Sequence, residues 1–229
     1  SGPASARFTY AYKPIAQMAL GFPSDGLFHL PDHPQIVIHP RVVYDRLANL
    51  DLALERGPWR FSTSVAYDNP ERDIGPDTWT SQVYSEAWIY SGLASVRLED
   101  AGVRAARLET GVLKVAGGHA RDHGRFSDEQ SKFDPRFQYY EAYLLGLKRE
   151  FRFGLIRPVA MQLRVVYDRM QNGGVFSYYA GYNLTKNWRA DLDIDMLGLL
   201  GPSRAQISDA FLSNYRANDR IGLGVSYVF

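Results

Sequence analysis

The sequence predicts an all-β fold in which about ten antiparallel strands form a single closed barrel, with eight or twelve strands as the alternatives. Three observations favour this fold: apolar and polar side chains alternate along most of the chain, aromatic residues make up 14% of it, and the predicted connections alternate between short and long. No linker or low-complexity tract interrupts the 229 residues, so residues 1–229 are predicted to form one domain.

Ten runs of the chain show the period-two pattern of a β-strand. Successive side chains of a strand point to opposite faces, so a run with one apolar and one polar face is expected to separate two different environments. In order, the runs are 8–13, 36–54, 59–68, 84–99, 106–112, 139–156, 159–168, 176–184, 188–196 and 220–229.

The run 188–196 shows the pattern most clearly. Trp188, Leu192 and Met196 share one face, whereas every acidic residue of the run falls on the other. A helix would scatter these acids round its circumference, so the pattern predicts a strand.

The second and sixth runs carry charges on their apolar faces. Arg46 falls there in the second run, and Glu141 and Arg149 do so in the sixth. A shift of one residue moves every following side chain to the other face of a sheet. We therefore expect a change of phase near Arg46, and a β-bulge or a break near Lys148.

The connections between runs differ in length in a regular way. The short ones are 56–58, 100–102, 157–158 and 185–187, the long ones are 21–35, 69–80, 117–136 and 201–218, and 170–174 is the exception. Short turns on the periplasmic side and long loops on the extracellular side are typical of barrels that span an outer membrane.

The last run adds a resemblance to a known class of proteins. Ile221, Leu223, Val225, Tyr227 and Phe229 share one face of it, and small or polar residues occupy the other. This run resembles the terminal strand of bacterial outer-membrane β-barrel proteins, with a closing Phe and a Tyr two residues before it. The resemblance implies a bacterial outer-membrane location, contact with outer-membrane lipids, and an assembly signal at Tyr227 and Phe229 that the barrel-assembly machinery recognises.

A soluble β-barrel or sandwich is the alternative fold. Its apolar face would be a core, and its charged face would be solvated. Small residues such as Gly222, Gly224 and Ser62 on the polar face favour the membrane barrel. The crowded lumen of a narrow barrel needs small side chains, and a solvated face does not.

The charges on the polar faces nearly balance, which predicts a lumen filled largely by ion pairs. The predicted lumen-lining residues are Asp191, Asp193, Asp195, Arg189, Arg164, Arg107, Glu109, Arg60 and Arg220. The three aspartates form an acidic ladder on one strand, and such a ladder would attract cations if a narrow pathway stays open.

Four of the five histidines occur in two copies of the motif His-x-x-Asp-His. His29 and His33 lie in the first long connection, and His119 and His123 lie in the third. Imidazole and carboxylate groups are common ligands of zinc and nickel, so these histidines are candidate ligands for a divalent metal at the outer rim. Coincidence in two polar loops is the alternative, and no other cofactor is predicted.

Composition and motifs exclude several functions. The absence of cysteine excludes disulfides and thiolate metal sites, and the net charge of +1 argues against a nucleic-acid partner. No run is apolar for long enough to form a membrane helix, and no Gly-x-Ser-x-Gly motif is present.

Two classes of function remain. The sequence favours a narrow channel, or the barrel component of an envelope transport or export assembly with an envelope protein as its partner. The alternatives are an outer-membrane enzyme that acts on lipid or envelope substrates at the surface rim, where His39, His119 and His123 could lie, and a metal-binding surface protein.

Overall fold

The computed structural model describes residues 3–23, 39–71, 78–80, 83–100, 103–118, 120–121, 133–134, 136–199, 211–215 and 218–227. Most of these residues belong to one antiparallel sheet, and its ten long strands match the number that the sequence predicts. The long strands are β1 (Ala4–Pro23), β2 (His39–Arg56), β3 (Trp59–Pro70), β6 (Ala87–Asp100), β7 (Val103–Gly117), β9 (Glu141–Phe151), β10 (Val159–Asp168), β11 (Gly173–Asn183), β12 (Trp188–Leu199) and β13 (Arg220–Tyr227).

Three short strands and one short helix complete the described elements. β4 (Thr78–Thr80) pairs with the end of β1 and becomes the eleventh strand of the sheet. β5 (Val83–Tyr84) pairs with β8 (Ala120–Arg121) outside the sheet. The helix is α2 (Phe211–Asn214), and no helix among the described residues is long and apolar enough to cross a membrane.

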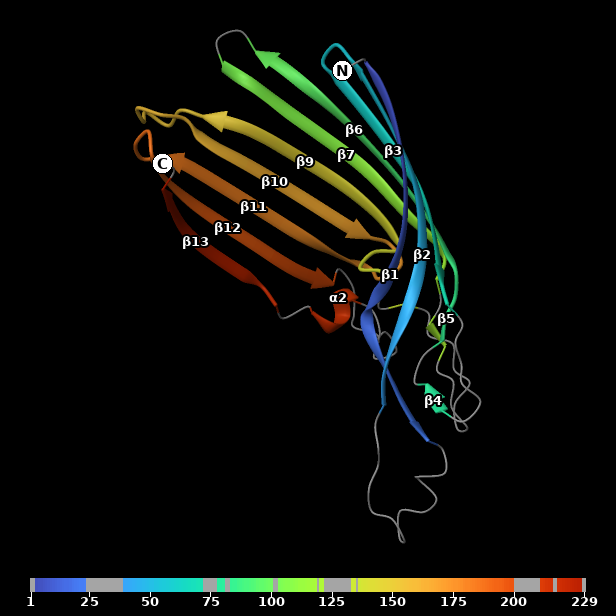
Figure 1. Cartoon of the computed structure of the whole chain (residues 1–229). Helices are drawn as coiled ribbons and strands as arrows, with labels where there is room; N and C mark the ends of the chain where they lie inside the picture. The colour runs from blue at the N-terminus through green and yellow to red at the C-terminus, as the bar shows by residue number, and fades with distance from the viewer. Residues whose placement is uncertain are drawn as a thin grey trace.

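Each long strand pairs with the long strands before and after it in the chain. The sheet curves into a trough, and its two outermost long strands, β1 and β13, are not paired with each other (Figure 1). The sheet is therefore open in the described residues, and the closure of the barrel stays a prediction.

The long strands end at two opposite ends of the trough (Figure 1). At one end, β2 meets β3, β6 meets β7, β9 meets β10 and β11 meets β12, and β1 starts and β13 ends there. We call this the short-turn end, because few residues separate the two strands of each pair in the chain. The opposite ends of the strands, where only the four residues between β10 and β11 form a short connection, lie at what we call the loop end.

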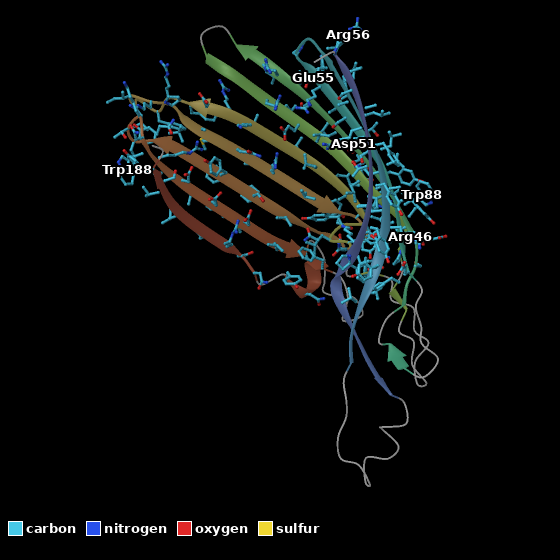
Figure 2. The ribbon with its side chains drawn as sticks, in the orientation of Figure 1. Arg46, Asp51, Glu55, Arg56, Trp88 and Trp188 are labelled. Carbon is cyan, nitrogen blue, oxygen red and sulfur yellow. The ribbon has the colours of Figure 1, made fainter. Side chains whose placement is uncertain are left out.

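The two faces of the trough differ in composition and burial. Large apolar side chains cover the convex face and are exposed, as Leu145 at 55% and Leu223 at 83% show. Small or charged side chains cover the concave face, where Ala142 and Gly146 are buried on the strand that exposes Leu145. Figure 2 shows Trp88 on the convex side.

Two belts of aromatic side chains border the convex face. The loop-end belt contains Tyr12, Tyr44, Tyr67, Trp88 and Tyr143, and the short-turn belt contains Trp59, Phe61, Phe151, Phe153, Trp188 and Tyr227.

The distance between the belts is close to the thickness of an apolar membrane layer. Tyr67 follows Trp59 by eight positions on β3, and Phe151 follows Tyr143 by eight positions on β9. At about 3.3 Å per residue and a tilt of about 40°, this spacing corresponds to a band roughly 20 Å tall. Aromatic girdles of a transmembrane barrel flank an apolar band of about 25 Å.

The expected change of phase at Arg46 is wrong. The register of β2 continues through Arg46 on both sides, and the irregularity lies in β1, between Pro14 and Met18. Arg46 lies on the convex face near the loop end, where its guanidinium is 3.4 Å from the Glu71 carboxylate. A charge at the rim can therefore share a face with apolar residues without a shift of register.

The expected bulge near Lys148 is also wrong, because β9 keeps its register with β10 from Ala142 to Phe151. The pairing of β9 with β7 ends at Lys148. Glu141 lies at the loop-end rim and forms an ion pair of 3.1 Å with Arg169. Arg149 lies at the other rim, with its guanidinium 5.1 Å from the ring centre of Phe151.

Two predicted runs extend beyond the observed strands. The run 139–156 contains β9 and then part of the connection 152–158, in which Gly154 has a φ of 72°. Tyr84 belongs to β5, where it is buried, so the predicted run 84–99 becomes a strand that starts at Ala87.

Candidate functional site on the concave face

The concave face has three zones along the strands. Near the loop end, a hydrogen-bonded network crosses the trough. A band of small and apolar residues lies in the middle of the wall, and charged side chains dominate near the short-turn end. Together these zones form the candidate site.

The acidic ladder of β12 lies on the concave face, but two of its three acids are engaged. Asp191 is 2.7 Å from Nε of Arg189 and accepts a hydrogen bond of 2.5 Å from the Tyr179 hydroxyl. Asp195 forms an ion pair of 2.7 Å with Arg220. The carboxylate of Asp193 has no side-chain partner among the described residues. The ladder therefore carries less free negative charge than its sequence suggests.

Other predicted lumen residues also pair with residues on other strands. Arg164 on β10 is 3.3 Å from Glu109 on β7, and the residue between them on β9 is Gly146. A Cβ at Gly146 would be in ordinary van der Waals contact with both side chains, 3.4 Å from the Glu109 carboxylate and 3.5 Å from Arg164, so the pair lies directly over this residue. Arg60 pairs with Glu55, at 3.4 Å, which the sequence analysis did not propose.

Arg107 belongs to a row of three basic residues. Arg97 on β6 lies directly opposite Arg107 on β7, and Arg107 lies directly opposite Lys148 on β9. No hydrogen bond or ion pair joins these three side chains to any other side chain that the structure describes. Gln162 and Tyr179 continue the row on the next two strands. We call Arg97, Arg107 and Lys148 the basic row.

The middle of the concave wall is apolar. Leu93, Gly111, Leu144 and Val166 follow one another in register across β6, β7, β9 and β10. They line one side of a cavity of about 780 Å³, and polar residues including Arg7 line the other side. Ion pairs therefore do not fill this part of the described trough.

The loop-end network is built round Arg136, which the sequence analysis did not single out. Its guanidinium binds the Asp134 carboxylate at 2.7 Å and the Asp68 carboxylate at 3.1 Å, and it donates to the Ser85 carbonyl oxygen at 2.7 Å. It also lies 5.1 Å from the ring centre of Tyr84. Burial alone would lower the pKa of Arg136, but its hydrogen bonds and the charge of Asp134 outweigh burial and raise that pKa.

Asp168 anchors the other side of the network. Its buried carboxylate accepts hydrogen bonds from the backbone N–H groups of Tyr140, at 2.5 Å, and Gln171, at 2.9 Å. The Gln171 side chain donates to the Gln138 carbonyl oxygen at 2.7 Å and accepts from the Leu212 N–H at 2.9 Å. These bonds tie the loop between β10 and β11 to the segment before β9 and to α2.

Tyr140 joins the two halves of the network. Its hydroxyl donates to the Asp134 carbonyl oxygen at 2.9 Å and accepts from the Asp134 N–H. Burial raises the pKa of Tyr140 well above its usual range, so the phenol stays protonated and keeps this donor. The described residues of 133–140 are thereby held between β3 and α2, which lie on opposite sides of the trough.

Asp45 is the acidic group of this region that is least satisfied. It is buried beside Asp68, and its Oδ1 atom has no hydrogen-bond partner. Among the described residues, no group of three histidine or acidic side chains is placed to hold a metal ion.

Several sequence predictions lie outside the described residues. They are the candidate metal ligands His29, His33, His119 and His123, and Phe229 of the assembly signal. Tyr227 is described, and its ring centre lies 4.9 Å from that of Trp188 in the short-turn belt.

The loop-end network does not follow from the strand pattern of the sequence, because Asp134 and Arg136 lie in a predicted connection. One sequence feature could have indicated it. Phe133, Phe137 and Tyr140 are large apolar side chains at the end of a polar loop, and all three pack together in the structure.

No protein-family model, curated protein or solved structure matches the chain.

Proposed function

We propose that this chain is a narrow, closed β-barrel of the bacterial outer membrane, which acts as a channel or as the barrel component of an envelope transport assembly. One observation carries the proposal: the large apolar side chains are exposed on the convex face, between two aromatic belts. A soluble protein would bury such a face, whereas a lipid bilayer solvates it.

The open edges of β1 and β13 support closure of the barrel. In hydrocarbon, each unpaired backbone N–H or C=O group costs several kcal/mol, so a sheet in a membrane must close. The number of long strands is even, so β1 and β13 run in opposite directions and can pair as the other strands do.

The registers of the sheet predict how β1 and β13 meet. Paired residues lead across the sheet from Pro3, at the start of β1, to Arg220 on β13. A barrel of ten strands tilted by about 40° needs a stagger of roughly 12 residues. This stagger places Arg220 opposite residue 15 of β1, and therefore Tyr227 opposite Phe8.

Cysteine cross-linking tests the closure, since the chain contains no cysteine of its own. We expect the Phe8→Cys and Tyr227→Cys double variant, refolded in lipid vesicles, to form an intramolecular disulfide. The double variant Phe8→Cys and Leu223→Cys is the matched control. Both side chains lie on the convex face, but the predicted register places Phe8 opposite Tyr227 and not opposite Leu223. If Tyr227→Cys cross-links with cysteine at none of Ala6, Phe8 and Tyr10, closure is wrong.

The loop-end network supports a lumen that is closed at rest. Arg136 and Asp168 hold the described part of segment 133–140 across the trough through buried hydrogen bonds. A segment held in this way narrows the path along the concave face, so we expect small conductance from the unmodified protein.

Conductance across planar lipid bilayers tests the channel function. Arg136→Ala removes the centre of the network, and Gln171→Ala removes a neighbouring link that leaves the buried carboxylates paired. We expect both variants to have a larger conductance than the unmodified protein. Arg46→Ala, on the convex face, is the control, and we expect its conductance to equal that of the unmodified protein. Large conductance from the unmodified protein, unchanged by either concave-face substitution, would contradict the proposal. The enzyme and metal-binding alternatives depend on histidines outside the described residues.

A further inference from the structure

The basic row is an arrangement that the fold does not explain by itself. Arg97, Arg107 and Lys148 occupy directly opposed positions on three neighbouring strands, all on the concave face. Like charges placed directly opposite each other destabilise a sheet. Their persistence therefore points to a compensating negative charge.

None of the acidic side chains that the structure describes near the row supplies that charge. Glu109 lies two residues from Arg107 on the same face, but it is only 16% exposed and pairs with Arg164. Glu150 lies two residues from Lys148 and has an interaction of its own with another group. Asp193 is in register with the row, but Gln162 and Tyr179 lie between it and Lys148.

The row has the chemistry of an anion-binding site. Arginine presents a planar fork of N–H donors that matches a carboxylate or a phosphate, and lysine adds a mobile point charge. Neighbouring strands are about 4.8 Å apart, so the three charges extend over roughly 10 Å. Arg97 and Lys148 are exposed on the concave side, so a solute in the trough can reach them.

We propose that Arg97, Arg107 and Lys148 form a binding site for a solute with two or more phosphate or carboxylate groups, on the lumen wall near the short-turn end. The proposal depends on the proposed barrel for the route by which the solute arrives. A basic site on the lumen wall also reverses the ion selectivity that the acidic ladder predicts, which is a preference for cations. Two acids of that ladder are neutralised and the basic row is not, so a conducting lumen would prefer anions.

Calorimetric titration of the full chain in neutral detergent micelles tests the site. The probes are tripolyphosphate, for phosphate chemistry, and citrate, for carboxylate chemistry, both at low ionic strength. The test variant carries Arg97→Gln, Arg107→Gln and Lys148→Gln.

The matched control variant carries Arg7→Gln, Arg60→Gln and Arg220→Gln. It loses the same charge from the same face, but each of its arginines already has an acidic partner, at 3.5, 3.4 and 2.7 Å respectively. Circular dichroism and gel mobility without heating show whether both variants fold.

We expect the unmodified protein to bind at least one probe, the test variant to bind it at least about tenfold more weakly, and the control to bind it within about threefold. The probe that binds distinguishes phosphate from carboxylate chemistry. Equal losses in the two variants would show general charge attraction and overturn the site, as would the absence of binding by the unmodified protein. Binding in micelles does not require conduction, so a protein that binds the probe would keep the site even if neither it nor its Arg136→Ala and Gln171→Ala variants conduct, a result that would refute the channel.

Discussion

The convex and concave faces of the trough are built from the same strands, yet they place opposite kinds of side chain in opposite environments. On the convex face, charged residues occur at the rims and large apolar residues are exposed between them. On the concave face, most charged residues pair with an opposite charge or join a buried network, whereas the basic row has no such partner among the described side chains.

The difference shows which solvent each face is suited to. An exposed face of Leu, Val and aromatic residues is stable in lipid, where burying a charge is expensive. On the concave face, a buried charge that has an opposite partner is stable only while it keeps that partner. The same substitution should therefore have different effects on the two faces, and three matched pairs of variants test this.

The largest effect is expected for the removal of a buried arginine. Arg136→Met leaves Asp134 and Asp68 buried without their cation, which should cost about 3–5 kcal/mol. Arg46→Met removes a convex-face ion pair whose arginine side chain is 57% exposed, and should cost about 0–1 kcal/mol. Urea unfolding of both variants in detergent micelles measures the difference, and similar losses would show that the network does not stabilise the loop end.

The second pair places adjacent residues of β12 on opposite faces. Leu192→Arg puts a charge into lipid near mid-strand and should cost about 2–4 kcal/mol. Asp193→Asn removes a concave-face charge that has no side-chain partner among the described residues, so it should cost less than about 1 kcal/mol. Refolding into lipid vesicles at graded urea concentrations gives both values. Equal losses would contradict the assignment of the faces.

The smallest effect compares two glycines on neighbouring strands. Gly111→Val places a side chain on the concave face, where a Cβ would lie 3.1 Å from the Leu93 side chain, and should cost about 1–3 kcal/mol through overpacking. Gly92→Val points to the convex face, where the nearest atom is 3.6 Å away on Val112. Its effect should stay within about 0.5 kcal/mol. If the valine at position 92 is the more harmful in micelle unfolding, the concave wall is less crowded than the contacts indicate.

The strands themselves could be predicted well from the sequence, because alternation is a local property. The run 188–196 matches the first nine residues of β12, and its apolar and acidic faces fall on opposite sides of the sheet. The prediction failed where a charge belonged to a rim. Arg46 and Glu141 interrupt the apolar pattern at the point along their strands where the apolar band ends and the loop end begins. The sequence alone does not show where along a strand that point lies.

The candidate site was less predictable than the strands. Glu109 and Arg164 could be placed on the polar face, but their pairing depends on the register of three strands. The basic row could not be seen either. Arg97, Arg107 and Lys148 are far apart in the chain, and only the strand registers bring them together.

The sequence by itself determined the all-β class, the ten long strands and the two faces of each strand. These features follow from steric and solvation preferences that act within a few residues. Only the tertiary structure decided which charges find partners, where the apolar band interrupts the concave wall, and how Arg136 reaches Asp68 across the loop end. Those outcomes depend on the stagger accumulated over many strand pairs, and on a loop that folds back over the sheet. The stagger of the strands and the path of the loop are both determined by interactions between residues that are distant in the chain.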